Sequence, residues 1–111
     1  ITYTFQEDYL FIDTNMYSDY ILYFDTIEAI EYRAEGIPGT RVSGFGTPRL
    51  LLGWFQNEEL GNHIRYTYGG NTPCILLTVK GKALVIGGAD EAETKALYEA
   101  LVTKWEAAKQ G

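Results

Sequence analysis

Hydrophobic and polar residues alternate along much of the chain before residue 87, and a period of two is typical of β-strands that bury one face. The alternation begins at once, in Ile1–Phe5. Further strands are predicted at residues 9–12, 20–24, 63–68, 74–79 and 82–86. Polar or glycine-rich residues separate these segments. Residues 1–13 are therefore predicted to form one hairpin, and Lys80-Gly81 is predicted to be the tight turn of another.

The middle of the chain has a less definite pattern. Residues 28–32 fit a fourth strand and a short helical turn equally well. Gly44 and Gly46 follow, between the segments Arg41–Ser43 and Leu50–Leu52. A dinucleotide-binding loop needs a third glycine and a following helix, and this stretch has neither. We therefore interpret these glycines as bulges or sharp bends, where a sheet folds over itself.

The last part of the chain follows a different period, which predicts an amphipathic helix at residues 90–108. Leu97, Leu101 and Trp105 recur every fourth residue and form one apolar stripe. Asp90 and Glu93 have the spacing of a capping box, which satisfies free N–H groups in the first turn of a helix. A stripe that ends in a tryptophan needs a large apolar surface to cover. The strands before the helix must supply that surface.

The composition predicts a single folded domain over residues 1–111. Hydrophobic residues make up 46% of the chain, and the net charge is -6. This acidic balance argues against nucleic acid or an anionic lipid surface as a partner, because both select clusters of lysine and arginine. The charge is uneven, since residues 1–35 are strongly acidic and residues 36–88 carry net positive charge. The two parts can attract each other within the fold or between copies, or they can form ordinary solvated surface.

Few residues in the sequence could carry chemistry. Cys74 is the one cysteine and lies in an apolar run, so we expect a buried, unreactive thiol. His63 is the one histidine, and a metal site or an acid–base pair would need further ligands that converge on it. Glu58 and Glu59 are adjacent, and adjacent side chains usually point apart, which makes a shared catalytic proton a poor interpretation. We predict no enzyme activity, no metal and no cofactor.

Three parts of the chain resemble the bacterial pleckstrin-homology (PH) domains. They are Tyr23–Ile30, with its aromatic, acidic and isoleucine residues around a turn; Arg41–Gly46 with Leu52–Phe55; and Lys82–Thr94, where the last strand leads into the helix. The resemblance implies a mainly β fold with one C-terminal helix. We expect a PH-like barrel of about seven antiparallel strands in two bent sheets, capped by the amphipathic helix.

The resemblance also implies a non-enzymatic domain that acts through contacts with a protein partner or with a second copy of itself. Many bacterial PH domains are fused to transmembrane helices, and the strand pattern here begins directly at Ile1. We therefore expect a part of a longer, membrane-linked protein that lies in the cytoplasm, at the inner face of the membrane. Relatives that bind phosphoinositides carry basic residues at the first hairpin. This chain has Gln6, Glu7 and Asp8 there, so we expect no phosphoinositide binding.

The candidate contact residues lie in the basic middle of the chain: Arg41, Arg49, Trp54, Phe55 and Arg65. Trp54 has an alternative interpretation as plain core, because tryptophan is usually largely buried. An alternative function is that of a small-molecule or lipid-binding barrel, since the chain has more aromatic residues than a core of this size needs. A barrel filled by Phe, Leu and Trp side chains would leave no room for such a ligand.

Overall fold

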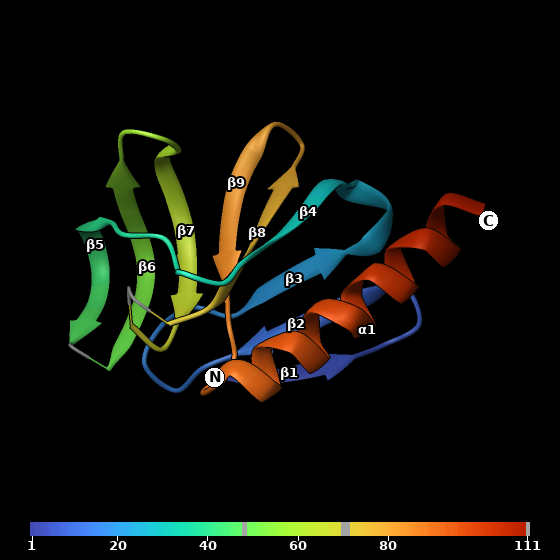
Figure 1. The fold of residues 1–111 in the computed structure, drawn as a ribbon, viewed down its shortest axis with the longest axis horizontal. Coiled ribbons are helices and arrows are strands. Elements are labelled where there is room, and N and C mark those ends of the chain that lie inside the picture. Colours follow the sequence, from blue (N-terminus) through green and yellow to red (C-terminus); the bar gives the residue numbers. More distant parts are fainter. Residues whose placement is uncertain (48, 70–71, 111) are drawn as a thin grey trace.

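The computed structural model describes residues 1–47, 49–69 and 72–110, which form nine strands and one α-helix (Figure 1). The strands are β1 (Thr2–Phe5), β2 (Tyr9–Asp13), β3 (Tyr20–Tyr23), β4 (Ile27–Arg33), β5 (Thr40–Thr47), β6 (Leu50–Asn57), β7 (Gly61–Thr67), β8 (Cys74–Val79) and β9 (Lys82–Ile86). The helix is α1 (Glu91–Gln110), and a short 3-10 turn, η1 (Phe24–Thr26), precedes β4. The mainly β fold with one C-terminal helix is confirmed, although the described residues form nine strands where about seven were expected.

The strands form two sheets. A meander of order β1-β2-β3 makes the smaller sheet, and the larger one has the order β4-β8-β9-β7-β6-β5. Neighbouring strands are antiparallel except for β7 and β9, which are parallel. No backbone ladder joins the two sheets in the described residues, so they do not close into one continuous barrel. The predicted hairpin of β1 and β2 is confirmed, and so is the turn between β8 and β9, where Lys80 and Gly81 both have positive φ.

The main core lies between the two sheets and under the helix. It contains fully enclosed side chains from both sheets: Leu10, Ile12, Leu22, Leu52, Tyr66, Ile75, Leu77 and Ile86. Each such aliphatic side chain contributes about 1.5–3 kcal/mol when it is removed from water. Because inward-facing residues alternate along the strands, these contacts fix the register of both sheets.

The helix α1 begins at the Asp90 cap that the sequence predicts, and Glu93 reaches back to the residue before the cap. Asp90 Oδ1 accepts a hydrogen bond from the backbone N–H of Glu93 at 2.8 Å, and Glu93 Oε2 accepts one from the N–H of Ala89 at 2.8 Å. Leu97 and Leu101 are buried in the main core, and Trp105 is half-buried beside it. The apolar stripe therefore packs on the strands as expected.

The glycines of the middle segment lie in the β5–β6 hairpin. Gly44 is paired with Gly53, and their φ angles are +113° and +118°. A Cβ atom on Gly44 would lie 2.3 Å from the carbonyl oxygen of Leu52, so the two strands approach too closely for a side chain. The pairing register shifts between Arg41 and Ser43, next to these glycines. The predicted irregularity is therefore present, and residues 28–32, for which two structures were open, belong to strand β4.

Residues 34–39 connect β4 to β5, which lie at opposite edges of the larger sheet. This crossover segment therefore runs across the outer face of that sheet, in front of the middle strands in Figure 1. Ile37 packs there with Cys74 and Val85 in a second small core. The crossover segment covers outward-facing side chains of β7, and Arg65 beneath it is only 1% exposed.

Candidate functional site

The three-stranded sheet covers only part of the inner face of the larger sheet. In Figure 1, the upper parts of β6, β7, β8 and β9 extend beyond β3, which is the edge strand of the smaller sheet. A pocket of about 440 Å³ lies on this uncovered part. We call it the Trp54 pocket, and its lining residues are Tyr20, Trp54, Leu60, Asn62, Ile64 and the segment Val79–Leu84.

Apolar side chains from adjacent strands form the floor of the Trp54 pocket. Trp54 of β6 is paired with Ile64 of β7, which is paired with Leu84 of β9. Leu84 is buried, whereas Trp54 and Ile64 are half-buried and remain accessible. Tyr20 forms the wall on the side of β3, and its ring packs against the edge of Tyr66 with the centroids 6.2 Å apart. An apolar, aromatic hollow of this kind is the usual form of a binding site.

Two lysines stand at the rim of the Trp54 pocket. Lys80 and Lys82 flank the β8–β9 turn, and both are exposed. Glu28 accepts a hydrogen bond from the backbone N–H of Gly81 at 2.9 Å, which ties the turn to the start of β4. Within the described residues, neither lysine forms a salt bridge. The pocket therefore combines an apolar floor with a rim that carries two lysines, with the carboxylate of Glu28 bound to the turn between them.

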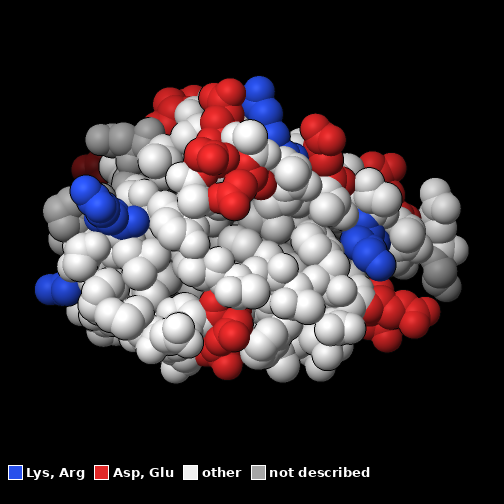
Figure 2. Space-filling model, turned by 90° about the horizontal axis from the view of Figure 1, so that it is seen from below, with Lys and Arg blue, Asp and Glu red and all other residues white. Residues whose placement is uncertain are grey.

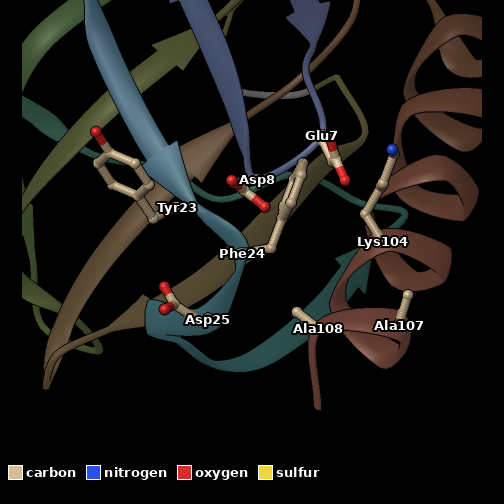
Figure 3. Close-up of a pocket in the computed structure, with 8 residues that line it drawn as sticks. All are labelled: Glu7, Asp8, Tyr23, Phe24, Asp25, Lys104, Ala107 and Ala108. Carbon is tan, nitrogen blue, oxygen red and sulfur yellow. The ribbon is translucent and has the colours of Figure 1, made fainter. Parts of the chain in front are cut away.

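A second hollow, of about 720 Å³, lies between the first hairpin, η1 and the end of α1 (Figure 3). Its charged groups are the carboxylates of Glu7, Asp8 and Asp25 and the ammonium of Lys104. Figure 3 shows the ring of Phe24 between Asp8 and the helix that carries Lys104. This hollow therefore offers one cation against three carboxylates, two of them at the tip of the first hairpin, which is the opposite of what a phosphate headgroup needs.

Charged side chains are sparse and mostly acidic on the underside of the molecule as Figure 1 draws it. Figure 2 views that side and shows groups of acidic side chains around a broad uncharged area, with few basic ones. This distribution agrees with the net charge of -6. It provides no continuous basic patch on this side of the kind that binds a nucleic-acid backbone.

The five contact residues expected from the sequence do not form one surface. Trp54 lines the pocket. Arg41 in β5 and Arg49 in the turn after it are exposed. Phe55 and Arg65 are both buried on the outer face of the larger sheet, and the guanidinium carbon of Arg65 lies 5.5 Å from the centre of the Phe55 ring. The structure thus brings Phe55 and Arg65 together but places them on the opposite face of the sheet from Trp54.

His63 lies beside Arg65, and its hydrogen bonds indicate which nitrogen carries the proton. Nδ1 lies 3.0 Å from the carbonyl oxygen of Gly61 and donates to it. Nε2 is then an acceptor, and it lies 3.4 Å from Nη2 of Arg65. Burial lowers the pKa of His63, and the positive charge of Arg65 lowers it further. The imidazole is therefore neutral at neutral pH.

The described residues do not assemble a catalytic set. Burial raises the pKa of the Cys74 thiol to about 11, so this buried group is protonated and unreactive near neutral pH, as predicted. The described part of the chain contains no group of three or more His, Cys, Asp or Glu side chains placed to hold a metal ion. Across the same residues, no helix has both the length and the apolar character required to span a bilayer.

Sequence reasoning did not find Tyr20, Lys80 and Lys82 as parts of a site. The available signal was the pair of lysines around Gly81, which sequence reasoning assigned to a turn and to the strand after it. Their place beside Trp54 depends on the parallel pairing of β7 with β9, which brings Leu84 next to Ile64. No local pattern predicts that pairing.

Comparison with known proteins gives one result on the family. The family model described as "Bacterial PH domain" matches residues 1–102, which include both sheets and the first half of α1. The search of curated proteins and the search of solved structures each found no match.

Proposed function

The chain belongs to the bacterial PH domain family, and we propose that it is a non-catalytic interaction domain. In this proposal the Trp54 pocket binds an apolar side chain of a protein partner. The observation that carries it is the uncovered inner face of the larger sheet, where half-buried Trp54 lines a hollow of about 440 Å³. PH domains are generally non-catalytic interaction modules. Tryptophan is also one of the residues most often found as a binding hot spot in protein interfaces.

The partner segment that fits this site has a large apolar residue next to acidic residues. Its apolar side chain would pack on Trp54 and Ile64, and its carboxylates would lie against Lys80 and Lys82. An extended segment suits the geometry, because among the described strands β3 pairs with β2 alone and its Tyr20 end lies beside the pocket.

Two further expectations from the sequence belong to the same proposal. Arg41 and Arg49 are exposed cations on the β5–β6 hairpin, which also carries Trp54, and they would meet acidic groups at the periphery of the partner. The domain would act as part of a longer, membrane-linked protein, with this surface facing the cytoplasm.

A peptide selection tests the proposal. Random peptides displayed on phage are selected on the immobilised domain, and the selected peptides are then measured by calorimetry against purified variants. Trp54→Ala is expected to weaken binding by about thirtyfold or more, because a central aromatic anchor contributes about 2 kcal/mol or more. Changing both Lys80 and Lys82 to Gln is expected to slow association and to reduce its dependence on salt.

Two matched variants control for changes outside the pocket. Tyr23→Ala removes an exposed aromatic ring from the acidic hollow, and Lys95→Gln removes an exposed lysine from α1; both should leave the affinity unchanged. Selected peptides with apolar and acidic residues that lose affinity only with the pocket variants support the proposal. Peptides that depend on Tyr23 instead, or no peptide that depends on Trp54, would contradict it. An oligomer that Trp54→Ala dissociates would identify a second copy of the chain as the occupant.

A second candidate function is the binding of a small amphipathic anion in the same pocket. A volume of about 440 Å³ favours it, since small-molecule sites usually fall between about 300 and 1,000 Å³. A carboxylate or phosphate on such a ligand would meet the two rim lysines. Thermal-shift measurements with fatty acids and aromatic carboxylates test this function: stabilisation that disappears in Trp54→Ala supports it, and no stabilisation of the wild-type domain rules out these classes.

A further inference from the structure

Arg65 is buried without a counter-charge. Its side chain is 1% exposed, and it is the only charged residue among the buried ones in the described chain. The salt bridges in that part of the chain involve Arg33 and Lys95 but not Arg65. Transfer of an isolated cation into a protein interior costs several kcal/mol, so such groups normally have a partner of opposite charge.

The contacts of Arg65 are few and long. Nη2 lies 3.4 Å from His63 Nε2 and 3.5 Å from the carbonyl oxygen of Pro38, and Nε has no hydrogen-bond partner. The ring of Phe55 is another close neighbour. The Nε–H and Nη2–H bonds point from the same edge of a guanidinium, and this edge binds the two oxygens of a carboxylate or phosphate. In Arg65, this edge makes no hydrogen bond of ordinary length.

Arg33 shows how a guanidinium of this protein behaves when carboxylates are near. Its Nε donates to Glu31 at 2.7 Å, and its two terminal nitrogens donate to the carboxylate of Glu59. Arg33 is partly exposed and fully paired, whereas Arg65 is enclosed and unpaired. The contrast shows that Arg65 keeps unused donors, because no acidic side chain of the described residues accepts a hydrogen bond from it.

We propose that Arg65 is the anchor of an anion site that binds a small oxyanion through Nε–H and Nη2–H. Nη2 carries two hydrogens, so it keeps its contact with His63 while it binds the anion.

The anion reaches Arg65 through the end of the crossover segment. Pro38, Gly39 and Thr40 are exposed, so the guanidinium lies one layer of residues below the surface. Gly39 has no side chain, and a Cβ atom there would lie 3.4 Å from Nη2. The carbonyl of Pro38 is held by Asn57 Nδ2 at 2.7 Å and by Arg65 only at 3.5 Å. An anion that binds Nη2 must displace this carbonyl, whose contact with Arg65 is the longer of its two hydrogen bonds.

Nuclear magnetic resonance on the complete domain tests this site directly. The Nε–H resonance of Arg65 is assigned with Arg65→Lys, and sodium phosphate or sodium acetate is then titrated at constant ionic strength. We expect a saturable shift of the Arg65 resonance and none for exposed Arg41. A response to phosphate alone assigns the site to a phosphate-type anion. A response to acetate as well assigns it to oxyanions in general, including a carboxylate of a partner.

Thermal denaturation provides a second measurement. An anion that binds the folded state raises the midpoint of unfolding in a saturable way. This rise is expected in the wild-type domain and in Arg41→Met, and its loss is expected in Arg65→Met. If the Arg65 resonance does not move, or moves without saturating, the proposal is overturned. The resonance experiment needs only the wild-type fold, so it decides the question even if Arg65→Met does not fold.

Discussion

The indole Nε1 of Trp105 donates a hydrogen bond to the backbone carbonyl of Ile27 at 2.9 Å. This bond joins the last third of α1 to the first residue of β4, which are 78 positions apart in the sequence. Lys109 lies one turn further along the helix, with Nζ 3.8 Å from the centre of the indole ring. The C-terminal end of the helix is therefore attached to the sheet by a specific polar contact as well as by the apolar stripe.

Replacing Trp105 by Phe tests how much this hydrogen bond contributes to the stability of the fold. The variant keeps an aromatic ring but leaves the carbonyl of Ile27 without its donor, so we expect the free energy of unfolding to fall by about 1 kcal/mol or more. Urea denaturation followed by circular dichroism measures the change. Lys109→Gln is the control, since it removes only the cation over the ring and should cost about 0.5 kcal/mol. A variant Trp105→Phe as stable as the wild type would show that water replaces the indole at no cost.

Gly44 offers a second test, because its backbone conformation and its surroundings both exclude a side chain. Gly44→Ala places a Cβ atom 2.3 Å from the carbonyl oxygen of Leu52, at a φ of +113°. We expect a loss of more than about 2 kcal/mol in unfolding free energy, or failure to fold. Gly61→Ala is the matched control: φ is +65° and no atom lies within 4 Å of the added Cβ, so about 1 kcal/mol is expected from backbone strain alone. Equal losses would mean that the close approach of β5 and β6 adds nothing.

The elements that sequence analysis predicted well are those with local causes. The Asp90 cap, the Lys80-Gly81 turn and the first hairpin depend on neighbouring residues, and the structure has all three. Trp54, for which a contact residue and plain core were both open, is half-buried and lines a pocket, and its role as a contact residue stays a prediction.

The parts that sequence analysis did not predict depend on long-range packing. His63, Arg65 and Thr67 alternate with Ile64 and Tyr66 along β7, and this period of two normally indicates that the polar set faces water. The crossover segment of residues 34–39 runs over that face and buries them. The residue pattern of β7 carries no information about the crossover segment, which connects the two edge strands and covers this face. The basic middle of the chain therefore suggested an exposed surface, while Arg65 lies in the interior.

The N-terminal cap of α1 gives a third prediction. Asp90→Ala removes the acceptor for the N–H of Glu93 and should lower the unfolding free energy by about 1 kcal/mol. Asp90→Asn keeps a side-chain oxygen and should retain most of the stability. Glu91→Ala is a control in the same helical turn, since it changes the charge of the turn and leaves the Asp90 cap intact. Chemical denaturation compares the four proteins. An Asp90→Asn variant as unstable as Asp90→Ala would assign the effect to charge at the helix terminus.

The last prediction concerns acid and rests on His63. Burial lowers the pKa of His63 in the folded state below its ordinary value of 6.5, so below that pH the unfolded chain binds more protons than the folded one. The stability due to the neutral ring is therefore fully present above pH 6.5 and is lost as the pH falls towards the folded-state pKa.

The groups with shifted pKa values near His63 titrate outside this window. Cys74 lies on the same outer face, and burial raises the pKa of its thiol to about 11. The positive charge of Arg65 opposes the protonation of His63 at every pH in the series. Arg33 lowers the pKa of Glu59 below 4.5, so the stability from that pair is lost only at lower pH. Urea denaturation at a series of pH values between about 7 and 5 should show decreasing stability in the wild type and a flat profile in His63→Gln. The same slope in both proteins would mean that other groups, and not the enclosed imidazole beside Arg65, set the response to acid.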